Sequence, residues 1–279
     1  MASDRISPTA HYTAHVWYRN GLSHRALATA QGRLLFHALR PMYLASRHIG
    51  APTLEGFLLA RHHEINRRLA EHVVSGQIQQ VLEVAAGLSP RGWSFKKQFG
   101  DRLRYVEADL PEMAARKRAL LERGNLSSKG HEVLDLDILS TSGSSSFGEV
   151  VAQLDQGKGL AIVTEGLLNY FARDQVQTMW SGFAHALQAF PPGIYLSDLH
   201  LRAQNLGLSV DLFRKLLARF VRGGIHLHYA NEADAERALL EAGFDDAKLH
   251  IAEAQAGSLG TIDDRGAGLV RIIEARTPR

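Results

Sequence analysis

The chain has 279 residues, of which 45% are hydrophobic, and a formal net charge of +3. This length fits one large domain or one core with an appended cap, and the composition allows a buried core. The arginines are scattered rather than gathered in a stripe with aromatic residues between them, which argues against a nucleic-acid-binding protein. Cysteine is absent, which excludes a disulfide framework and a thiol nucleophile.

The sequence also gives no sign of a leader or a membrane segment. No apolar run follows positive charge at the start of the chain, as it does in a secretory signal. No run approaches the roughly 18 apolar residues that a membrane helix needs. We therefore expect a soluble, cytoplasmic protein with no membrane partner.

The first 76 residues have a helical pattern. Apolar residues recur at mixed three- and four-residue spacing from Leu22 to Leu44 and again from Leu54 to Val74, and Pro41 and Pro52 punctuate these stretches. We expect residues 1–76 to form a helical cap or lid in front of a core that spans residues 77–279.

From Ile78 onward, strand and helix patterns alternate. The expected strands are 81–85, 104–108, 132–136, 160–164, 194–199, 247–252 and 268–275, and the expected helices are 92–99, 111–123, 147–156, 173–189, 211–221 and 232–241. Alternation with apolar strands predicts an α/β fold, with a mostly parallel sheet covered on both faces and its last strand reversed. Residues 203–229 are longer than a crossover needs, and we expect them to form a lid insertion after the fifth strand.

One segment points to a nucleoside-containing cofactor. The strand 81–85 leads into a turn with Gly87, and the next strand ends at Asp109, about 20 residues later. Glycine lets the backbone approach a ligand, and the carboxylate can accept hydrogen bonds from ribose hydroxyls. The turn lacks the GxGxxG pattern, because Ala85 occupies the first glycine position. Glu83 in the first strand also disfavours a diphosphate, although it suits a ligand with a cationic amino-acid end.

Three segments in order carry a resemblance to a known family. VLEVAAGLSPRG, YVEADLPEMAARKRALL and VTEGLLNYF resemble successive motifs of the leucine carboxyl methyltransferase family, and the similarity runs from about Phe57 to Phe171. This family includes polyketide O-methyltransferases of secondary metabolism and uses S-adenosylmethionine. The resemblance implies a class I methyltransferase, Rossmann-like sheet, with S-adenosylhomocysteine as the product.

The resemblance also implies roles for individual residues. Arg61 matches the arginine that holds the methionine carboxylate, Gly87 is the turn glycine, and Asp109 takes the ribose hydroxyls. Asp135 and Leu136 flank the adenine, and Glu165, before Gly166, meets the methionine amino group. Glu107 shares a strand face with Asp109, and the tip position favours Asp109. The expected cofactor-binding residues are Arg61, Glu83, Gly87, Glu107, Asp109, Leu110, Asp135, Leu136, Glu165 and Gly166.

The methyl acceptor is less well defined. Methyl transfer is an in-line displacement that depends on positioning; an ionised carboxylate needs no general base, whereas a hydroxyl does. Candidates for positioning the acceptor or acting as a base are His11, Tyr12, His15, Tyr18, Tyr170 and His200. We expect no metal site, because adjacent His62 and His63 do not share a helix face.

These patterns predict an S-adenosylmethionine-dependent O-methyltransferase that acts on a carboxylate, or a hydroxyl, of a small-molecule or carrier-bound metabolite. Two alternatives remain. One is an NAD(P)-dependent Rossmann oxidoreductase, which the missing GxGxxG pattern disfavours. The other is a non-catalytic S-adenosylmethionine-binding module that serves a partner protein. The sequence leaves the acceptor and the oligomeric state open.

Overall fold

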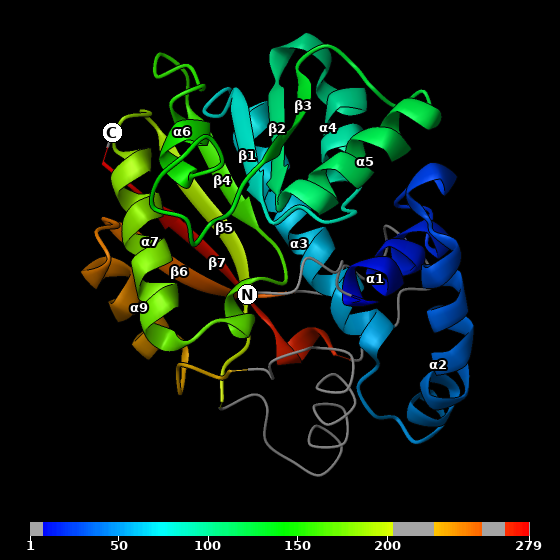
Figure 1. Cartoon of the computed structure of the whole chain (residues 1–279). Helices are drawn as coiled ribbons and strands as arrows, with labels where there is room; N and C mark the ends of the chain where they lie inside the picture. Colours follow the sequence, from blue (N-terminus) through cyan, green and yellow to red (C-terminus); the bar gives the residue numbers. More distant parts are fainter. Residues whose placement is uncertain (1–7, 203–225, 253–265, 279) are drawn as a thin grey trace.

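A computed structural model describes residues 8–202, 226–252 and 266–278. Its centre is a seven-stranded sheet with strand order β3-β2-β1-β4-β5-β7-β6 (Figure 1). The strands are β1 Gln80–Val84, β2 Arg104–Asp109, β3 His131–Asp135, β4 Leu160–Thr164, β5 Gly193–Leu199, β6 Asp246–Ile251 and β7 Arg271–Arg276. Strands β1 to β5 pair in parallel, and β7 runs antiparallel to both of its neighbours. The prediction of a mostly parallel α/β sheet with a reversed last strand is confirmed.

Helices cover both faces of this sheet. The helices are α1 Pro8–Arg19, α2 Ala30–His48, α3 Leu54–Val74, α4 Arg91–Phe99, α5 Pro111–Arg123, α6 Phe147–Val151, α7 Arg173–Leu187 and α9 Glu232–Glu241. Figure 1 shows α3, α4 and α5 on one face and α6, α7 and α9 on the other, and each face has its own buried hydrophobic cluster. The central strands β1, β4 and β5 are buried along their whole length, as strands between two helical layers should be.

The strand order fixes where a ligand can bind. β1 lies between β2 and β4, so the chain winds toward β3 on one side and toward β5 on the other. In open α/β sheets, ligands bind outside the carboxyl ends of the strands at such a reversal. The turn that follows β1 and the tips of β2, β4 and β5 therefore frame the candidate site.

Some element boundaries differ from those expected. Helix α2 begins only at Ala30, where the Thr29 side chain accepts a hydrogen bond from the backbone N–H of Gly32, and it continues through Pro41. Pro41 is exposed, so the carbonyl that its missing N–H leaves unbonded can be hydrated. Strand β7 starts later than expected because Ala267–Leu269 form a 3₁₀ turn. The helix expected at 147–156 ends at Val151.

Two further expectations lie outside the described residues, namely the helix at 211–221 and most of the insertion at 203–229. Within the described ranges, none of the helices has the length and hydropathy of a membrane span.

The N-terminal helices α1 and α2 pack against each other beside the sheet. Helix α1 packs closely on α2, where a Cβ atom at Gly32 would lie 2.1 Å from the carbonyl oxygen of His11. Helix α1 also reaches the turn after β1, because a Cβ atom at Gly87 would lie 3.8 Å from Cβ of Ala10. The first helix therefore lies over the candidate site.

Candidate functional site

The turn after β1 is hydrogen-bonded to the tip of β2. Ala85 and Gly87 both have left-handed backbone conformations, with φ of 55° and 51°. This turn directs the N–H of Gly87 to Oδ2 of Asp109 at 2.6 Å, while the N–H of Leu110 donates to Oδ1 at 2.8 Å. Each carboxylate oxygen of Asp109 keeps a further lone pair for a ligand hydroxyl. Burial raises the pKa of Asp109.

A second group of charges surrounds Arg61 of α3. Its Nε donates to Oε1 of Glu165 at 3.0 Å, and its Nη1 donates to Oδ2 of Asp198 at 3.1 Å. Asp198, the penultimate residue of β5, also accepts a 2.6 Å hydrogen bond from the N–H of Gly166 through Oδ1. Gly166 has φ of 68°, and a Cβ atom there would lie 2.9 Å from Nη2 of Arg61. Glycine is therefore required beside this guanidinium.

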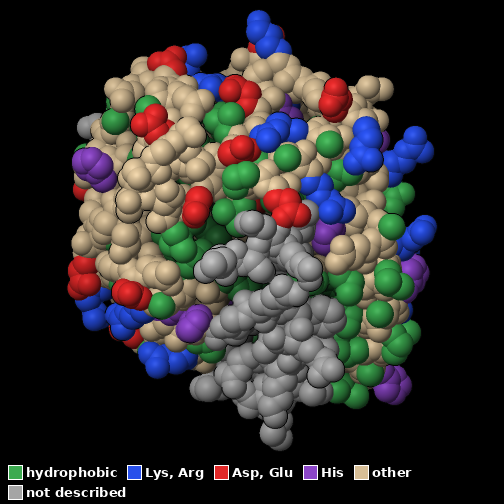
Figure 2. All heavy atoms as spheres, in the orientation of Figure 1, with side chains coloured by type: hydrophobic (Ala, Val, Ile, Leu, Met, Phe, Trp, Pro, Cys, Tyr) green, Lys and Arg blue, Asp and Glu red, His purple; other side chains and the backbone are tan. Residues whose placement is uncertain are grey.

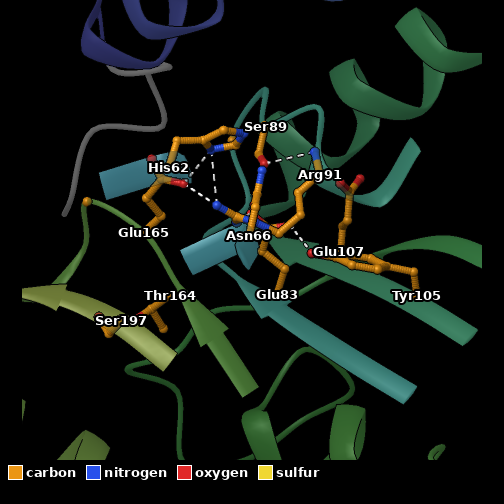
Figure 3. Close-up of polar contacts among 12 residues, drawn as sticks. His62, Asn66, Glu83, Ser89, Arg91, Tyr105, Glu107, Thr164, Glu165 and Ser197 are labelled. Atoms are coloured by element: carbon orange, nitrogen blue, oxygen red, sulfur yellow. Dashed lines mark hydrogen bonds and ion pairs between the residues drawn. The ribbon is translucent and has the colours of Figure 1, made fainter. Parts of the chain in front are cut away.

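Arg91, at the start of α4, is a second buried guanidinium in the same group (Figure 3). It forms ion pairs with both Glu83 and Glu165, and its Nε donates to Oδ1 of Asn66 at 2.5 Å. The second oxygen of Glu83 accepts a 2.7 Å hydrogen bond from the hydroxyl of Tyr105. Both oxygens of Glu83 are therefore bound, one by Arg91 and one by Tyr105. This carboxylate lies beneath the candidate site rather than at its surface.

His62 completes the contacts of Glu165. Its Nδ1 lies 2.8 Å from Oε2 of Glu165, and its ring lies 4.7 Å from the ring of Trp17. Burial lowers the pKa of His62 more than Glu165 raises it, so the ring is neutral at pH 7. Since an ionised carboxylate only accepts hydrogen bonds, Nδ1 carries the proton. Burial by itself raises the pKa of Glu165, but the hydrogen bond from His62 and the positive charges of Arg91 and Arg61 outweigh burial and hold this carboxyl ionised.

We call Arg61, Arg91, Glu83, Glu165 and Asp198 the charged cluster. It contains two guanidiniums and three carboxylates, which give a net charge of −1. All five side chains are buried. Burying an uncompensated charge is costly unless a partner of opposite sign binds. The cluster therefore suits a ligand with a net positive charge.

Glu107 does not reach the ligand side of the sheet. Its carboxylate is fully buried, with Nζ of Lys117 at 2.9 Å and Nε2 of His131 at 3.3 Å. Burial by itself raises the pKa of Glu107, but Lys117 and His131 outweigh burial and lower it. Gly92 of α4 leaves room for these groups. Glu107 therefore forms an ion pair inside the core, while its expected role in cofactor binding stays a prediction.

The tip of β3 separates the two residues expected at the adenine. Leu136 is buried, and its N–H donates a 2.7 Å hydrogen bond to the carbonyl oxygen of Asp109. Asp135 instead pairs with Arg118 at 2.9 Å, with both side chains almost half exposed. This pair lines a cavity of about 430 Å³ with Val133 and other residues at the edge of the sheet. The structure thus places Leu136 next to Asp109. The carboxylate of Asp135 is paired with Arg118 instead.

The six acceptor candidates separate into two groups. His11, Tyr12 and His15 are buried, and they pack where α1 meets α2; His11 bonds to Thr29, while the rings of Tyr12 and His15 contact Phe36. This position does not support an acceptor contact for these three residues, and Tyr18 on the same helix is 40% exposed.

Tyr170 and His200 lie near Arg61 and Asp198. The ring of His200 is 4.8 Å from that of Phe57, and its Nδ1 donates to the carbonyl oxygen of Leu269 at 3.0 Å. Burial lowers the pKa of His200, so a neutral ring with its proton on Nδ1 leaves Nε2 as a base.

The sequence did not reveal Arg91 and Asp198 as part of the site. Arg91 belongs to the quoted VLEVAAGLSPRG motif, and Asp198 is the penultimate residue of the strand expected at 194–199. A search for charged residues at every strand tip could have found Asp198. Among the residues that the structure describes, no group of three His, Cys, Asp or Glu side chains is arranged to hold a metal ion.

A family model for leucine carboxyl methyltransferases matches residues 20–184, more than half of the chain. The chain belongs to the leucine carboxyl methyltransferase family. It is therefore a member of a methyltransferase family that uses S-adenosylmethionine, as its motifs had indicated. No curated protein matches the sequence.

Solved structures are similar to this member of the family along almost its whole length. A DUF574 family protein from Streptomyces avermitilis is 15% identical, with a TM-score of 0.65 over 96% of this chain and 97% of that one. A proposed methyltransferase from Thermobifida fusca is 16% identical, with a TM-score of 0.62 over 98% and 96%. An O-methyltransferase family protein from Burkholderia thailandensis is 12% identical, with a TM-score of 0.50 over 91% and 61%. These likenesses show a methyltransferase fold.

Proposed function

We propose that this protein is an S-adenosylmethionine-dependent O-methyltransferase that methylates a carboxylate, or a hydroxyl, of a small-molecule or carrier-bound metabolite. The observation that carries the proposal is the buried charged cluster of net charge −1, beside a carboxylate that can bind a diol. S-adenosylmethionine has a ribose diol, and its sulfonium and ammonium outweigh its single carboxylate. Its chemistry therefore fits both parts of the site.

Each part of the cofactor has candidate partners in the chain. Asp109 would accept hydrogen bonds from the ribose hydroxyls, because its two oxygens are already oriented by backbone N–H groups. Arg61 would bind the methionine carboxylate through Nη2, since its hydrogen bonds to Glu165 and Asp198 within the described residues use Nε and Nη1. Leu110, 46% exposed beside Asp109, and Leu136 would supply apolar contacts to the adenine. When bound, the cofactor supplies an activated methyl group.

We propose that residues 1–76 cap the core formed by residues 77–279. Support comes from Ala10 of α1, which lies over the turn at Gly87. Helix α3, the last helix within residues 1–76, contacts the core directly, since Arg61 lies on it and pairs with Glu165 and Asp198. A cap in this position would exclude water from the transfer reaction and contribute to an acceptor pocket.

The acceptor oxygen belongs to one of two classes. The family name favours a carboxylate, which is ionised at pH 7 and needs no base. A hydroxyl acceptor would need a group such as Nε2 of His200 to take its proton. The pH dependence of turnover separates the classes, because only a hydroxyl acceptor makes the rate depend on the neutral form of His200.

Calorimetric titration of the purified protein with S-adenosylhomocysteine and with NADH tests the proposal. We expect S-adenosylhomocysteine to bind and NADH not to bind. Asp109→Ala should weaken S-adenosylhomocysteine binding at least about tenfold, because a charge-assisted pair of hydrogen bonds is lost. Asp246→Ala, at an exposed position on β6, is the matched control and should bind as the wild type does.

Two results would contradict the proposal. Binding of NADH in place of S-adenosylhomocysteine would favour the oxidoreductase alternative, although a cluster of net negative charge is poorly suited to a diphosphate. Binding of S-adenosylmethionine without methyl transfer to any carboxylate or hydroxyl acceptor would favour a non-catalytic module.

A further inference from the structure

The charges of this chain are unevenly distributed along its sequence. Residues 8–54 contain five arginines and neither aspartate nor glutamate, although the whole chain has 29 acidic residues. The five arginines are Arg19, Arg25, Arg33, Arg40 and Arg47, and all of them are exposed. This stretch contains α1 and α2. The N-terminal helices therefore present charge of a single sign to the solvent.

Helix α2 exposes apolar side chains as well. Its inner side packs on α1 through Phe36, whose ring contacts those of Tyr12 and His15. On its solvent side, Leu34 and Leu44 are 71% and 51% exposed, and Ile49, the residue after the helix, is 73% exposed. Figure 2 shows hydrophobic side chains gathered on the side of the molecule where Figure 1 places α2, with His and Lys or Arg side chains among them.

The arginines and the apolar residues form neighbouring lines along α2. Residues seven positions apart lie on nearly the same side of a helix, because seven residues make almost two turns. Arg33, Arg40 and Arg47 therefore form one line. The line that begins one position further contains Leu34 and Pro41, which are both exposed. An apolar stripe with arginines along its border is the arrangement of a helix that lies in the surface of a membrane, where the long basic side chains reach the headgroups.

The chemistry of this surface favours anionic lipid over other occupants. A second copy related by a two-fold axis would bring α2 against α2, so that like charges would meet. Protein surfaces normally mix charges of both signs, whereas α2 has no carboxylate, and the next one in the chain, on Glu55, lies 3.6 Å from Arg40. A plane of anionic headgroups needs no matched acid, and its apolar layer can take up exposed leucines.

We propose that α2 binds the surface of a membrane that contains anionic lipids, with Leu34, Leu44 and Ile49 entering the apolar layer and the arginines contacting phosphates. This inference goes beyond the proposed function and does not depend on it. It departs from the expectation of no membrane partner, which was based on the lack of a spanning segment, whereas a helix in the membrane surface does not span. Because α1 contacts both α2 and the turn at Gly87, the lipid would lie next to the helix that covers the candidate site.

Sedimentation of the full chain with lipid vesicles tests this proposal. The anionic probe is a vesicle of phosphatidylglycerol and phosphatidylcholine in equal amounts, and the neutral probe is a vesicle of phosphatidylcholine alone. We expect the protein to bind the neutral vesicle at least about tenfold more weakly, because the arginines lose their attraction to the surface. Added salt should weaken binding to the anionic vesicle by screening the same charges.

Single substitutions test whether α2 makes the contact. Leu34→Gln removes an apolar side chain and Arg33→Gln removes a charge, and each should weaken binding to the anionic vesicle about fivefold. The matched controls on α9 are Leu240→Gln, at a 47% exposed position, and Arg237→Gln, whose side chain is 66% exposed. Both controls should bind as the wild type does. All four positions are exposed, so thermal unfolding should stay unchanged and exclude a folding defect.

Four results would overturn the proposal. If the wild-type chain does not sediment with the anionic vesicle at low salt, the occupant of this surface is not lipid, and an acidic protein becomes the better candidate. Equal binding to both vesicles would show that the arginines do not contribute. Equal effects of the α2 and α9 variants would place the contact outside α2. A wild-type dimer that Leu34→Gln converts to a monomer would assign this side of α2 to a second copy of the chain.

Discussion

The backbone N–H of Gly87 donates a 2.6 Å hydrogen bond to Oδ2 of Asp109, so the turn after β1 and the tip of β2 form one unit. The turn reaches this geometry only because Ala85 and Gly87 take left-handed backbone conformations. Glycine adopts such a conformation without cost, whereas alanine does not. The ligand-facing geometry of Asp109 thus depends on a strained residue two positions before Gly87.

Ala85→Gly should stabilise the protein. The left-handed conformation costs an alanine about 1–2 kcal/mol, while glycine adds about 0.4–1 kcal/mol of unfolded-chain entropy. We expect a net gain of roughly 0.5–1 kcal/mol in the free energy of unfolding, measured with urea. Asn125 has a similar φ of 51°, and Asn125→Gly is the control; it should gain less, because asparagine tolerates this conformation better. A loss of stability in Ala85→Gly would contradict the assignment of strain.

Arg91→Gln should be strongly destabilising. The substitution leaves Glu83 and Glu165 buried with fewer compensating charges, and breaking a buried pair costs about 3–5 kcal/mol. The control is Arg118→Gln, which removes the almost half-exposed pair with Asp135 and should cost at most about 1 kcal/mol. Urea unfolding at pH 7 measures both. Equal effects of the two variants would show that Arg91 is not held as the structure describes.

Gly92→Ala should destabilise the ion pair inside the core. Its Cβ atom would lie 2.5 Å from Nε2 of His131 and 2.6 Å from Oε1 of Glu107, so these groups must move, at a cost of about 1–3 kcal/mol. Gly148→Ala in α6 is the control, because its Cβ atom would meet nothing within 4 Å and alanine favours a helix by about 0.5–1 kcal/mol. Thermal unfolding should therefore shift in opposite directions for the two variants.

His11 should make stability depend on pH in the acid range. Burial, with a smaller contribution from Arg116, lowers the pKa of His11 from 6.5 to about 4 in the folded chain. Between these values the unfolded chain binds a proton that the folded chain does not. The stability from neutral His11 is therefore present above pH 6.5 and is lost as the pH falls toward 4. Burial also lowers the pKa of His62, His200 and His228, which act in the same direction, so a matched variant is needed.

His11→Gln isolates this contribution. The variant keeps a polar side chain that can bond to Thr29, whose hydroxyl lies 2.9 Å from Nδ1 of His11. Urea unfolding at pH 7, 5.5 and 4.5 should show a smaller loss of stability in the variant than in the wild type. The same pH dependence in both proteins would show that His11 titrates normally.

The sequence predicted the parts of the site that depend on local order. A strand, a glycine turn and a strand with a terminal acid follow one another within a short stretch, and the structure joins Gly87 to Asp109 as that order implies. The alternation of apolar strands and helices predicted the sheet, because each strand pattern reports burial between two layers. Helix α3 was predicted at its observed bounds.

The remaining features depend on contacts between segments distant in sequence. The pairing of Arg61 with Asp198 spans 137 residues, and the pairing of Arg91 with Glu165 spans 74, so no local pattern indicates either contact. Glu107 occupies the same strand face as Asp109, and only the positions of Lys117 and His131 show that it belongs to the core. The helix expected at 211–221 lies outside the described residues.

The wide sequence separation within the charged cluster has a consequence for how the protein folds. Contacts between distant segments form late, because the chain between them must first lose its conformational freedom. A chain that has formed β1, β2 and β3 but not β4 and β5 would have the turn at Gly87 without Glu165 or Asp198. A complete cluster thus requires the sheet to be assembled as far as β5. A ligand that binds this cluster therefore stabilises the sheet as far as β5. Binding of the ligand can then be measured as a sign that these strands have assembled.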